Sequence, residues 1–299
     1  MFETTPIIDC AGRPLRLDRP RICGVVNVTP DSFSDGSKFL DADKAIEHAM
    51  ELVEHGADLL DIGGESTRPG AEEVASDEEI RRIVPVIQAL AAKTRVPISV
   101  DTSKPEVMRA AVAAGAGLIN DVYALRRDGA LEAATELNVP VCLMHMRGEP
   151  RTMQDDPRYD DVVSDVRSFL ADRIFACEMS GIDKKRIIAD PGFGFGKTLE
   201  HNLTLLRGLD QLGALGVPIL VGLSRKSMIG KLTGRDAGQR AAGSAAAAMI
   251  AVQRGAMIVR VHDVCETRDA LAVWQAVAQG LGPERPPEKP FGSRRFEDD

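Results

Sequence analysis

The stretch of sequence from Ile22 to Val28, ICGVVNV, is short, nearly continuous in apolarity and rich in β-branched residues. Strands that are buried on both faces of a parallel sheet have this composition. Further runs of the same kind follow it along the chain. They are Leu59–Gly63, Val96–Asp101, Gly117–Val122, Val139–His145, Ile187–Asp190, Val217–Leu223 and Met257–Val261. The sequence therefore predicts parallel strands that are covered on both faces.

Segments with helical periodicity lie between these runs. Apolar residues recur three and four positions apart in Ala42–Val53, Ile80–Leu90, Val107–Val112 and Val162–Leu170. This spacing is typical of amphipathic helices that pack one face on a sheet. Glycines stand where C-terminal caps belong, at Gly56, Gly115, Gly181 and Gly255.

The alternation predicts an α/β protein with a single (β/α)8 TIM barrel and a short N-terminal β-hairpin. We expect one catalytic domain over residues 1–281, in which residues 1–20 form the hairpin around Ala11 and Gly12. The tail 282–299 is rich in proline and charge, and we expect it to be disordered. A doubly wound open sheet is the alternative, because the strand runs are short.

Composition excludes several classes of function. The chain has 299 residues and a net charge of −8, which does not suit a general nucleic-acid or membrane-surface binder. Only 4% of residues are aromatic, which disfavours stacking platforms for single-stranded nucleic acid. The 5 cysteines are scattered without a CxxC pair, so neither a disulfide framework nor a zinc site is expected. With no secretory signal and no long apolar run, we expect a cytoplasmic protein without nucleic-acid or membrane partners.

Polar side chains mark the C-terminal end of each apolar run. In chain order they include Asn27, Asp61, Asp101, Asn120, Asp121, His145, Asp190, Ser224, Arg225, Lys226, Arg260, His262 and Asp263. In a barrel these strand ends meet at one mouth, where the active site of such folds is built. A buried polar group costs free energy unless it is satisfied, so the whole set favours a binding site.

The set divides by charge into two groups. One combines carboxylate and amide acceptors with a cation and suits a flat heterocycle with a guanidine-like edge: Asp101, Asn120, Asp190 and Lys226. The other combines donors and cations and suits phosphate, with Mg²⁺ held by the amide oxygen of Asn27: Asn27, Thr67, Arg68, Arg260 and His262. The alternative is that the Arg and Lys residues only pair with neighbouring Asp residues.

Three other segments contain residue types that could serve in binding or catalysis. The polar, Gly-containing segments Thr29–Leu40 and Glu65–Ser76 are typical of loops that close over a barrel mouth, although ordinary surface loops have a similar composition. Residues 191–198, PGFGFGKT, resemble a phosphate-binding P-loop, but Gly192 and Gly196 are too close together, and we do not expect that function. His145 is open to two interpretations, a ligand contact or a satisfied structural histidine.

Several of these stretches resemble the signatures of the dihydropteroate synthase family. The longest are Gly24–Gly36, GVVNVTPDSFSDG, and Asp61–Gly70, DIGGESTRPG. The resemblance continues in order over roughly residues 20–280, through Ser99–Thr102, Ile119–Asp121, Asp190–Lys197, Ser224–Ser227 and Arg260–Asp263.

The resemblance implies a transferase of folate biosynthesis on a (β/α)8 barrel. Such an enzyme joins 6-hydroxymethyl-7,8-dihydropterin pyrophosphate to p-aminobenzoate, forming 7,8-dihydropteroate and pyrophosphate. It uses Mg²⁺, is the target of sulfonamides, and typically forms a homodimer through barrel helices.

The resemblance also implies roles for individual positions. Pterin contacts fall on Asp101, Asn120, Asp190 and Lys226. Pyrophosphate contacts fall on Asn27, Thr67, Arg68, Arg260 and His262, with Asn27 as the metal ligand. The p-aminobenzoate pocket is formed by Phe33, Thr67, Arg68, Pro69, Phe195, Lys226 and Ser227. The resemblance assigns no role to Met144 or His145.

We predict an SN1-like path through a pterin methylene cation, without a covalent nucleophile. Arg260, His262 and Mg²⁺ would neutralise the departing pyrophosphate, and Asp101 and Asp35 would stabilise the cation. The catalytic candidates are Asp101, Asp35, Lys226 and Arg260.

Three alternatives remain at this point. A pterin-dependent methyltransferase has a similar barrel but needs no pyrophosphate site. A catalytically idle paralogue that binds pterin would be expected to lose loop residues, and both loop signatures are intact. A Schiff-base aldolase acting through Lys226 would need a lysine of depressed pKa, which nothing in the sequence indicates.

Overall fold

The structure is a computed structural model that describes residues 6–29, 38–66, 73–148 and 152–280. The predicted tail, 282–299, lies outside the described residues. So do five predicted site residues in the two loops: Phe33, Asp35, Thr67, Arg68 and Pro69. The roles expected for all of these residues, and the domain boundary at 281, stay predictions.

Eight parallel strands form the central sheet, in the order β8-β7-β6-β5-β4-β3-β10-β9. Their bounds are β3 Arg21–Asn27, β4 Leu59–Gly63, β5 Ile98–Asp101, β6 Leu118–Asp121, β7 Val141–Met144, β8 Ile187–Asp190, β9 Leu220–Val221 and β10 Ile258–Val261. A parallel bridge between Ala189 and Ile219 joins β8 to the residues that lead into β9, so the sheet closes on itself. The predicted barrel is confirmed, and the open sheet is wrong.

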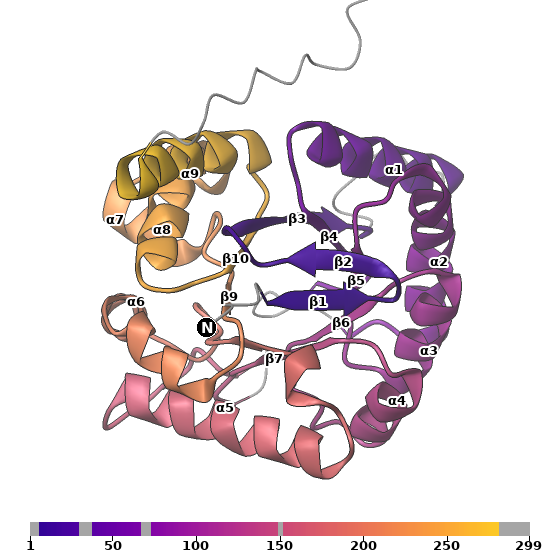
Figure 1. Cartoon of the computed structure of the whole chain (residues 1–299), viewed down its shortest axis with the longest axis horizontal. Coiled ribbons are helices and arrows are strands. Elements are labelled where there is room, and N and C mark those ends of the chain that lie inside the picture. The colour runs from indigo at the N-terminus through magenta and orange to yellow at the C-terminus, as the bar shows by residue number, and fades with distance from the viewer. Residues whose placement is uncertain (1–5, 30–37, 67–72, 149–151, 281–299) are drawn as a thin grey trace, which may run out of the picture.

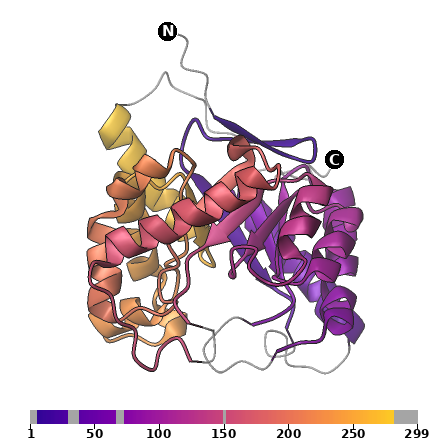
Figure 2. The same ribbon diagram turned by 90° about the horizontal axis from the view of Figure 1, so that it is seen from below.

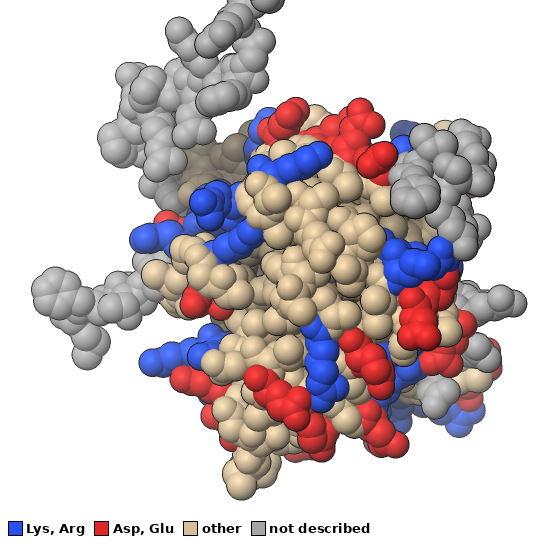
Figure 3. Space-filling view, turned by 90° about the vertical axis from the view of Figure 1, so that its right-hand side faces the viewer, with Lys and Arg blue, Asp and Glu red and all other residues tan. Residues whose placement is uncertain are grey.

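Helices surround the barrel as an outer ring (Figure 1). They are α1 Lys38–Glu54, α2 Ser76–Lys93, α3 Pro105–Ala114, α4 Ala130–Leu137, α5 Val162–Met179, α6 Leu199–Arg207, α7 Ser227–Thr233, α8 Ala241–Gln253 and α9 Val264–Gln279. The helical patterns predicted from the sequence fall in α1, α2, α3 and α5. Gly115 caps α3 with a φ of 117°, in the left-handed region that favours glycine. On the side of the barrel shown in Figure 3, acidic and basic side chains intermingle on the surface.

The predicted N-terminal hairpin is also confirmed. Strands β1 (Ile7–Cys10) and β2 (Arg13–Arg16) pair antiparallel around Ala11 and Gly12, whose φ angles of 52° and 81° suit a two-residue turn. Figure 2 shows the hairpin lying across one end of the barrel. Its buried side chains pack on the first residues of the barrel strands, so it covers the end opposite the strands' carboxyl ends.

Side chains along each strand alternate between the barrel interior and the helices. The first interior layer is apolar and packs beneath the hairpin: Cys23, Leu59, Leu118, Cys142, Ile188, Leu220 and Ile258. Two residues further along the strands, the same face carries Asp61, Asn120, Asp190 and Arg260. The intervening residues, such as Leu60, Ile119 and Val259, are buried in the larger core shared with the helices. The barrel interior therefore changes from apolar to polar one layer above the hairpin.

Candidate active site

Arg260 lies at the centre of the polar layer and connects three strands. Its Nε donates to Oδ2 of Asp61 at 2.6 Å, and its Nη2 donates to Oδ2 of Asp101 at 2.7 Å. The side-chain amide of Asn120 donates to the same oxygen of Asp61 at 3.0 Å. Strands β4, β5, β6 and β10 are therefore linked through one guanidinium group and the carboxylate of Asp61.

Burial and charge set the protonation of this cluster. Burial raises the pKa of Asp101 to about 7, although the neighbouring Arg260 opposes the shift. Burial alone would lower the pKa of Arg260, but Asp61 and Asp101 outweigh it and raise that pKa above its ordinary value. Oδ1 of Asp61 is buried and has no hydrogen-bond partner among the described residues. The cluster thus places two carboxylates against a permanently charged arginine.

Lys226 and Asp190 form a second part of the mouth. The Lys226 Nζ donates to the backbone oxygen of Phe193 and lies 4.6 Å from the centre of the Phe195 ring. Burial lowers the pKa of Lys226 to about 8, opposed by the nearby Asp190. Oδ1 of Asp190 accepts a hydrogen bond from the Gly192 N–H at 2.7 Å, and burial raises the pKa of Asp190. Nothing in the sequence indicated that the pKa of Lys226 would be lowered.

The residues predicted to contact pyrophosphate are only partly described. Asn27 is the last residue of β3 and pairs in register with Gly63 at the end of β4. The Nδ1 of His262 lies 3.0 Å from Oγ of Ser224, which also accepts the His262 backbone N–H at 3.1 Å. Ser227, which was predicted for the p-aminobenzoate pocket and not for pyrophosphate, begins α7 and is exposed. The structure thus brings Asn27 and His262 to the same end of the barrel as Asp101 and Asp190.

The oxygen ligands at the barrel mouth fit only one kind of magnesium site, in which the ion is bound mainly by waters and substrate phosphates. In the described part of the chain, no group of three or more His, Cys, Asp or Glu residues could hold a metal ion. Magnesium commonly keeps several waters and takes one or two protein oxygens together with substrate phosphates. The amide oxygen of Asn27 therefore fits a magnesium ion that is shared with a phosphate-bearing substrate.

The alternative interpretation, that the basic residues at the mouth only pair with neighbouring Asp residues, holds for some of them. Arg225 pairs with Asp263 at 2.5 Å and takes no part in the polar layer. Arg260 pairs with two carboxylates, yet these belong to the proposed site, so pairing and function are compatible there. Asp121 faces away from the interior, where it accepts hydrogen bonds from Ser103 and from the backbone of Tyr123 and Leu125. Its role is to stabilise the turn after β6.

Sequence reasoning assigned no role to a buried ionic cluster at the base of the second loop. The Lys104 Nζ donates to Glu65 and to Glu79, each at 2.6 Å. The other oxygen of Glu65 accepts the Val74 N–H at 3.1 Å, which links the two ends of the loop. A Lys three residues after Asp101 was the only sequence signal, and its partners come from other elements.

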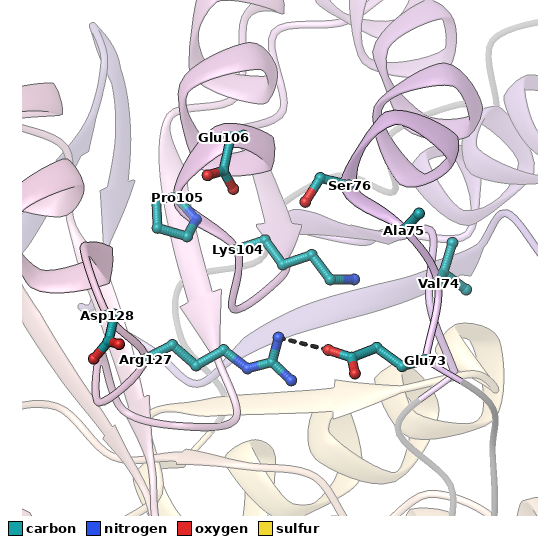
Figure 4. A pocket seen from close by; sticks show the side chains of 9 residues that line it. All are labelled: Glu73, Val74, Ala75, Ser76, Lys104, Pro105, Glu106, Arg127 and Asp128. Atoms are coloured by element: carbon teal, nitrogen blue, oxygen red, sulfur yellow. Dashed lines mark ion pairs between the residues drawn. The ribbon is translucent and has the colours of Figure 1, made fainter.

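A pocket of about 600 Å³ adjoins this cluster, between the start of α2 and the start of α3 (Figure 4). Arg127 and Glu73 form an ion pair of 2.9 Å across it. Lys104 and Glu106 also line it. This mixture of opposite charges gives the pocket no strong preference for either sign of ligand.

Comparisons with known proteins agree with the geometry. The family model described as "Pterin binding enzyme" matches residues 23–262. Dihydropteroate synthase of Escherichia coli K12 is 51% identical over 265 residues, which cover 89% of this chain and 94% of that protein.

Solved structures show the same similarity. Dihydropteroate synthase of Xanthomonas albilineans with 4-aminobenzoic acid is 61% identical with a TM-score of 0.88, covering 93% of this chain and 100% of that one. The same enzyme has been solved with 7,8-dihydropteroate. The Yersinia pestis enzyme in a sulfonamide drug complex is 49% identical with a TM-score of 0.87, covering 91% and 99% of the two chains.

The Arg260 cluster gives a first prediction. The change Arg260→Met leaves Asp61 and Asp101 buried side by side without their counter-charge, and it should lower the free energy of unfolding by about 3–5 kcal/mol at neutral pH. Chemical denaturation measures the loss. Arg109→Met is the matched control, because its ion pair with Glu136 is exposed and should be worth less than about 1 kcal/mol. Equal losses in the two variants would contradict the assignment.

Proposed function

The chain belongs to the pterin binding enzymes and, within them, to the dihydropteroate synthases, and we propose that the polar mouth of its barrel holds both substrates. It is a transferase of folate synthesis that condenses 6-hydroxymethyl-7,8-dihydropterin pyrophosphate with p-aminobenzoate to give 7,8-dihydropteroate and pyrophosphate. The observation that carries this conclusion is the 61% identity, over 93% of the chain, to a synthase solved with 4-aminobenzoic acid. As a synthase it falls in the class that sulfonamides target.

We assign the pterin to the carboxylate side of the mouth. Asp101, Asn120 and Asp190 project from neighbouring or facing strands and offer acceptors for the N–H groups of a guanidine-like edge. Lys226 would complete the set as a donor for a ring oxygen or nitrogen. The excess of carboxylates over cations in this region favours a ligand whose edge donates hydrogen bonds.

The pyrophosphate belongs, in this proposal, on the side of Asn27 and His262. The His262 imidazole is held by Ser224, so it can donate toward an oxyanion from a fixed position. Thr67 and Arg68 would add contacts from the second loop. When bound, Mg²⁺ would supply charge neutralisation to the departing pyrophosphate, with Asn27 as its protein ligand.

The reaction then follows an SN1-like path. Cleavage of the carbon–oxygen bond leaves a methylene cation on the pterin, and the carboxylate of Asp101, with Asp35, would stabilise that charge. Arg260 holds Asp101 in place, and its guanidinium would help to neutralise the departing pyrophosphate. The amine of p-aminobenzoate attacks the methylene carbon from a pocket formed by Phe33, Pro69, Phe195 and Ser227, and the nitrogen then releases a proton to solvent. No step needs a covalent bond to the protein.

The assay that tests the function uses purified protein with both substrates and Mg²⁺. We expect pyrophosphate and dihydropteroate to appear in equal amounts, and both to depend on p-aminobenzoate and on the metal. Chelation with EDTA should abolish turnover, and added Mg²⁺ should restore it. Pterin binding without turnover would instead indicate an idle paralogue, and no binding would contradict the site.

The pKa of Asp101 predicts a pH dependence. The ionised Asp101 carboxylate accepts two parallel N–H groups, whereas protonation turns one of its oxygens into a donor and removes the charge. Because its pKa is about 7, lower pH removes the form that binds the pterin edge best. Between pH 7.5 and 6 the ionised fraction falls by roughly eightfold, so the affinity for 6-hydroxymethyl-7,8-dihydropterin should fall by about the same factor. Titration calorimetry at each pH measures the change. In Asp101→Asn the affinity should be lower throughout and should no longer follow this profile; an unchanged profile would contradict the assignment.

We also propose a homodimer that forms through the outer face of α8 and α9. Figure 1 shows these helices side by side on the outside of the ring. Val273 and Val277, one turn apart on α9, are 67% and 83% exposed, and Ile250 of α8 is also exposed. A second copy of the chain would cover this apolar face.

We also propose a cytoplasmic location, which agrees with cysteines that are all free.

Sedimentation of the wild-type chain should give twice the monomer mass of 32.2 kDa. Val277→Glu places a charge in the proposed interface and should shift the protein to monomer at micromolar concentration. Phe175→Glu is the matched control, because Phe175 is 64% exposed on α5, away from this face. Dissociation by both variants, or by neither, would contradict the interface.

A further inference from the structure

The P-loop-like segment contains a buried lysine that the proposed reaction does not use. Lys197 lies between β8 and α6 and is only 3% exposed. A P-loop lysine would extend toward a phosphate, but this one turns back into its own loop. Its surroundings therefore need a separate explanation.

The Lys197 Nζ makes three polar contacts, all inside the protein. It donates to the backbone oxygen of Gly192 at 2.8 Å and to that of Phe195 at 3.0 Å. It also lies 2.9 Å from Nδ1 of His145, in the segment that follows β7. Burial lowers the pKa of Lys197 well below its ordinary value. Nζ carries two N–H donors and a lone pair as an amine, or three N–H donors as an ammonium group, and in either form these three contacts use its full capacity. No donor remains for a phosphate.

The protonation of His145 agrees with its contact to the Lys197 Nζ. Burial lowers the pKa of His145 to about 2, with a further contribution from Lys197, so the imidazole is neutral and Nδ1 can accept a hydrogen bond. The His145 ring packs edge-on against Phe169, which fixes its orientation. Of the two interpretations left open for His145, the structural one describes these contacts.

At two positions the loop lies so close to the segment that follows β7 that only glycine, which has no side chain, fits there. A Cβ on Gly192 would overlap the backbone oxygen of His145, and one on Gly196 would overlap that of Arg147. Both glycines have positive φ angles. Lys197 thus connects two turns of the loop to the segment on which the loop rests.

The same loop presents three groups to the proposed site. The Gly192 N–H donates to Asp190, the Phe193 oxygen accepts from Lys226, and the Phe195 ring lies beside the Lys226 Nζ. Two of these three residues, Gly192 and Phe195, are direct partners of Lys197. Displacement of the Lys197 Nζ would therefore release the backbone on both sides of Phe193.

We propose that Lys197, seated on His145, is a positioning residue for the condensation, holding the loop so that Phe195 lines the p-aminobenzoate pocket and Phe193 orients Lys226. The proposal rests on the proposed function and deepens it. Lys197 touches neither substrate in this arrangement. Its effect passes through the backbone of the loop.

The main test is Lys197→Met, which keeps the length of the side chain and removes the donors. We expect the KM for p-aminobenzoate to rise by about tenfold or more, because displacements of about 1 Å in positioning elements reduce rates by up to about a hundredfold. The Kd for dihydropterin pyrophosphate should rise less, by about threefold. Two of the four pterin residues, Asp190 and Lys226, contact the loop, but Asp101 and Asn120 lie on strands that the loop does not hold. Lys185→Met, at an exposed lysine, is the matched control and should behave as wild type.

A purely structural lysine would change the melting temperature and leave the kinetic constants of the folded protein unaltered, and that result would overturn the proposal. A second pair of variants covers the case in which Lys197→Met does not fold. His145→Gln keeps an acceptor and should stay close to wild type, whereas His145→Leu removes it and should raise the KM for p-aminobenzoate. Equal kinetics in the two His145 variants would also overturn it. An inactive wild type would instead contradict the proposed function itself.

Discussion

The contact of Arg260 with Asp61 and Asp101 is the interaction on which the site depends. All three side chains lie inside a closed barrel, where ions are costly unless they are paired and hydrogen-bonded. Two carboxyl groups share one guanidinium, so the cluster carries a net negative charge when Asp101, whose pKa is about 7, is ionised. A ligand that donates several N–H groups, or that develops positive charge, compensates that excess. Oδ1 of Asp61 has no hydrogen-bond partner among the residues that the structure describes, so those residues alone do not fully satisfy the cluster.

The rest of the mouth is held by a different means. Asp61, Asp101 and Arg260 lie on strands and bind each other through their side chains. The side chains of Asp190, the last residue of β8, and of Lys226 instead contact the backbone of the loop after β8. Loop backbone is inherently less rigid than a strand, so it needs internal ties. The buried Lys197 supplies them, at the cost of removing an amine from water.

Much of the fold could be predicted because its signal is local. Each strand appears as an apolar run, and the polar residue that ends it marks the mouth. The roles of Asp61 and Lys197 could not be predicted, since their partners are distant in sequence. Arg260 is 199 positions from Asp61, and His145 is 52 positions from Lys197. Only closure of the barrel and the contact of β7 with β8 bring these pairs together.

Within each strand the side chains alternate between two faces, and this alternation explains at which level of the barrel interior the site lies. A run such as LLDIG appears continuous in apolarity, yet its residues belong to two faces. Leu60 and Ile62 face the helices, while Leu59 and Asp61 face the interior, first beneath the hairpin and then at the mouth. A shift of one residue in register would press Asp61 against the helices and turn Leu60 inward. Burial on the helix side therefore fixes the register, and the register in turn fixes the height at which the interior becomes polar.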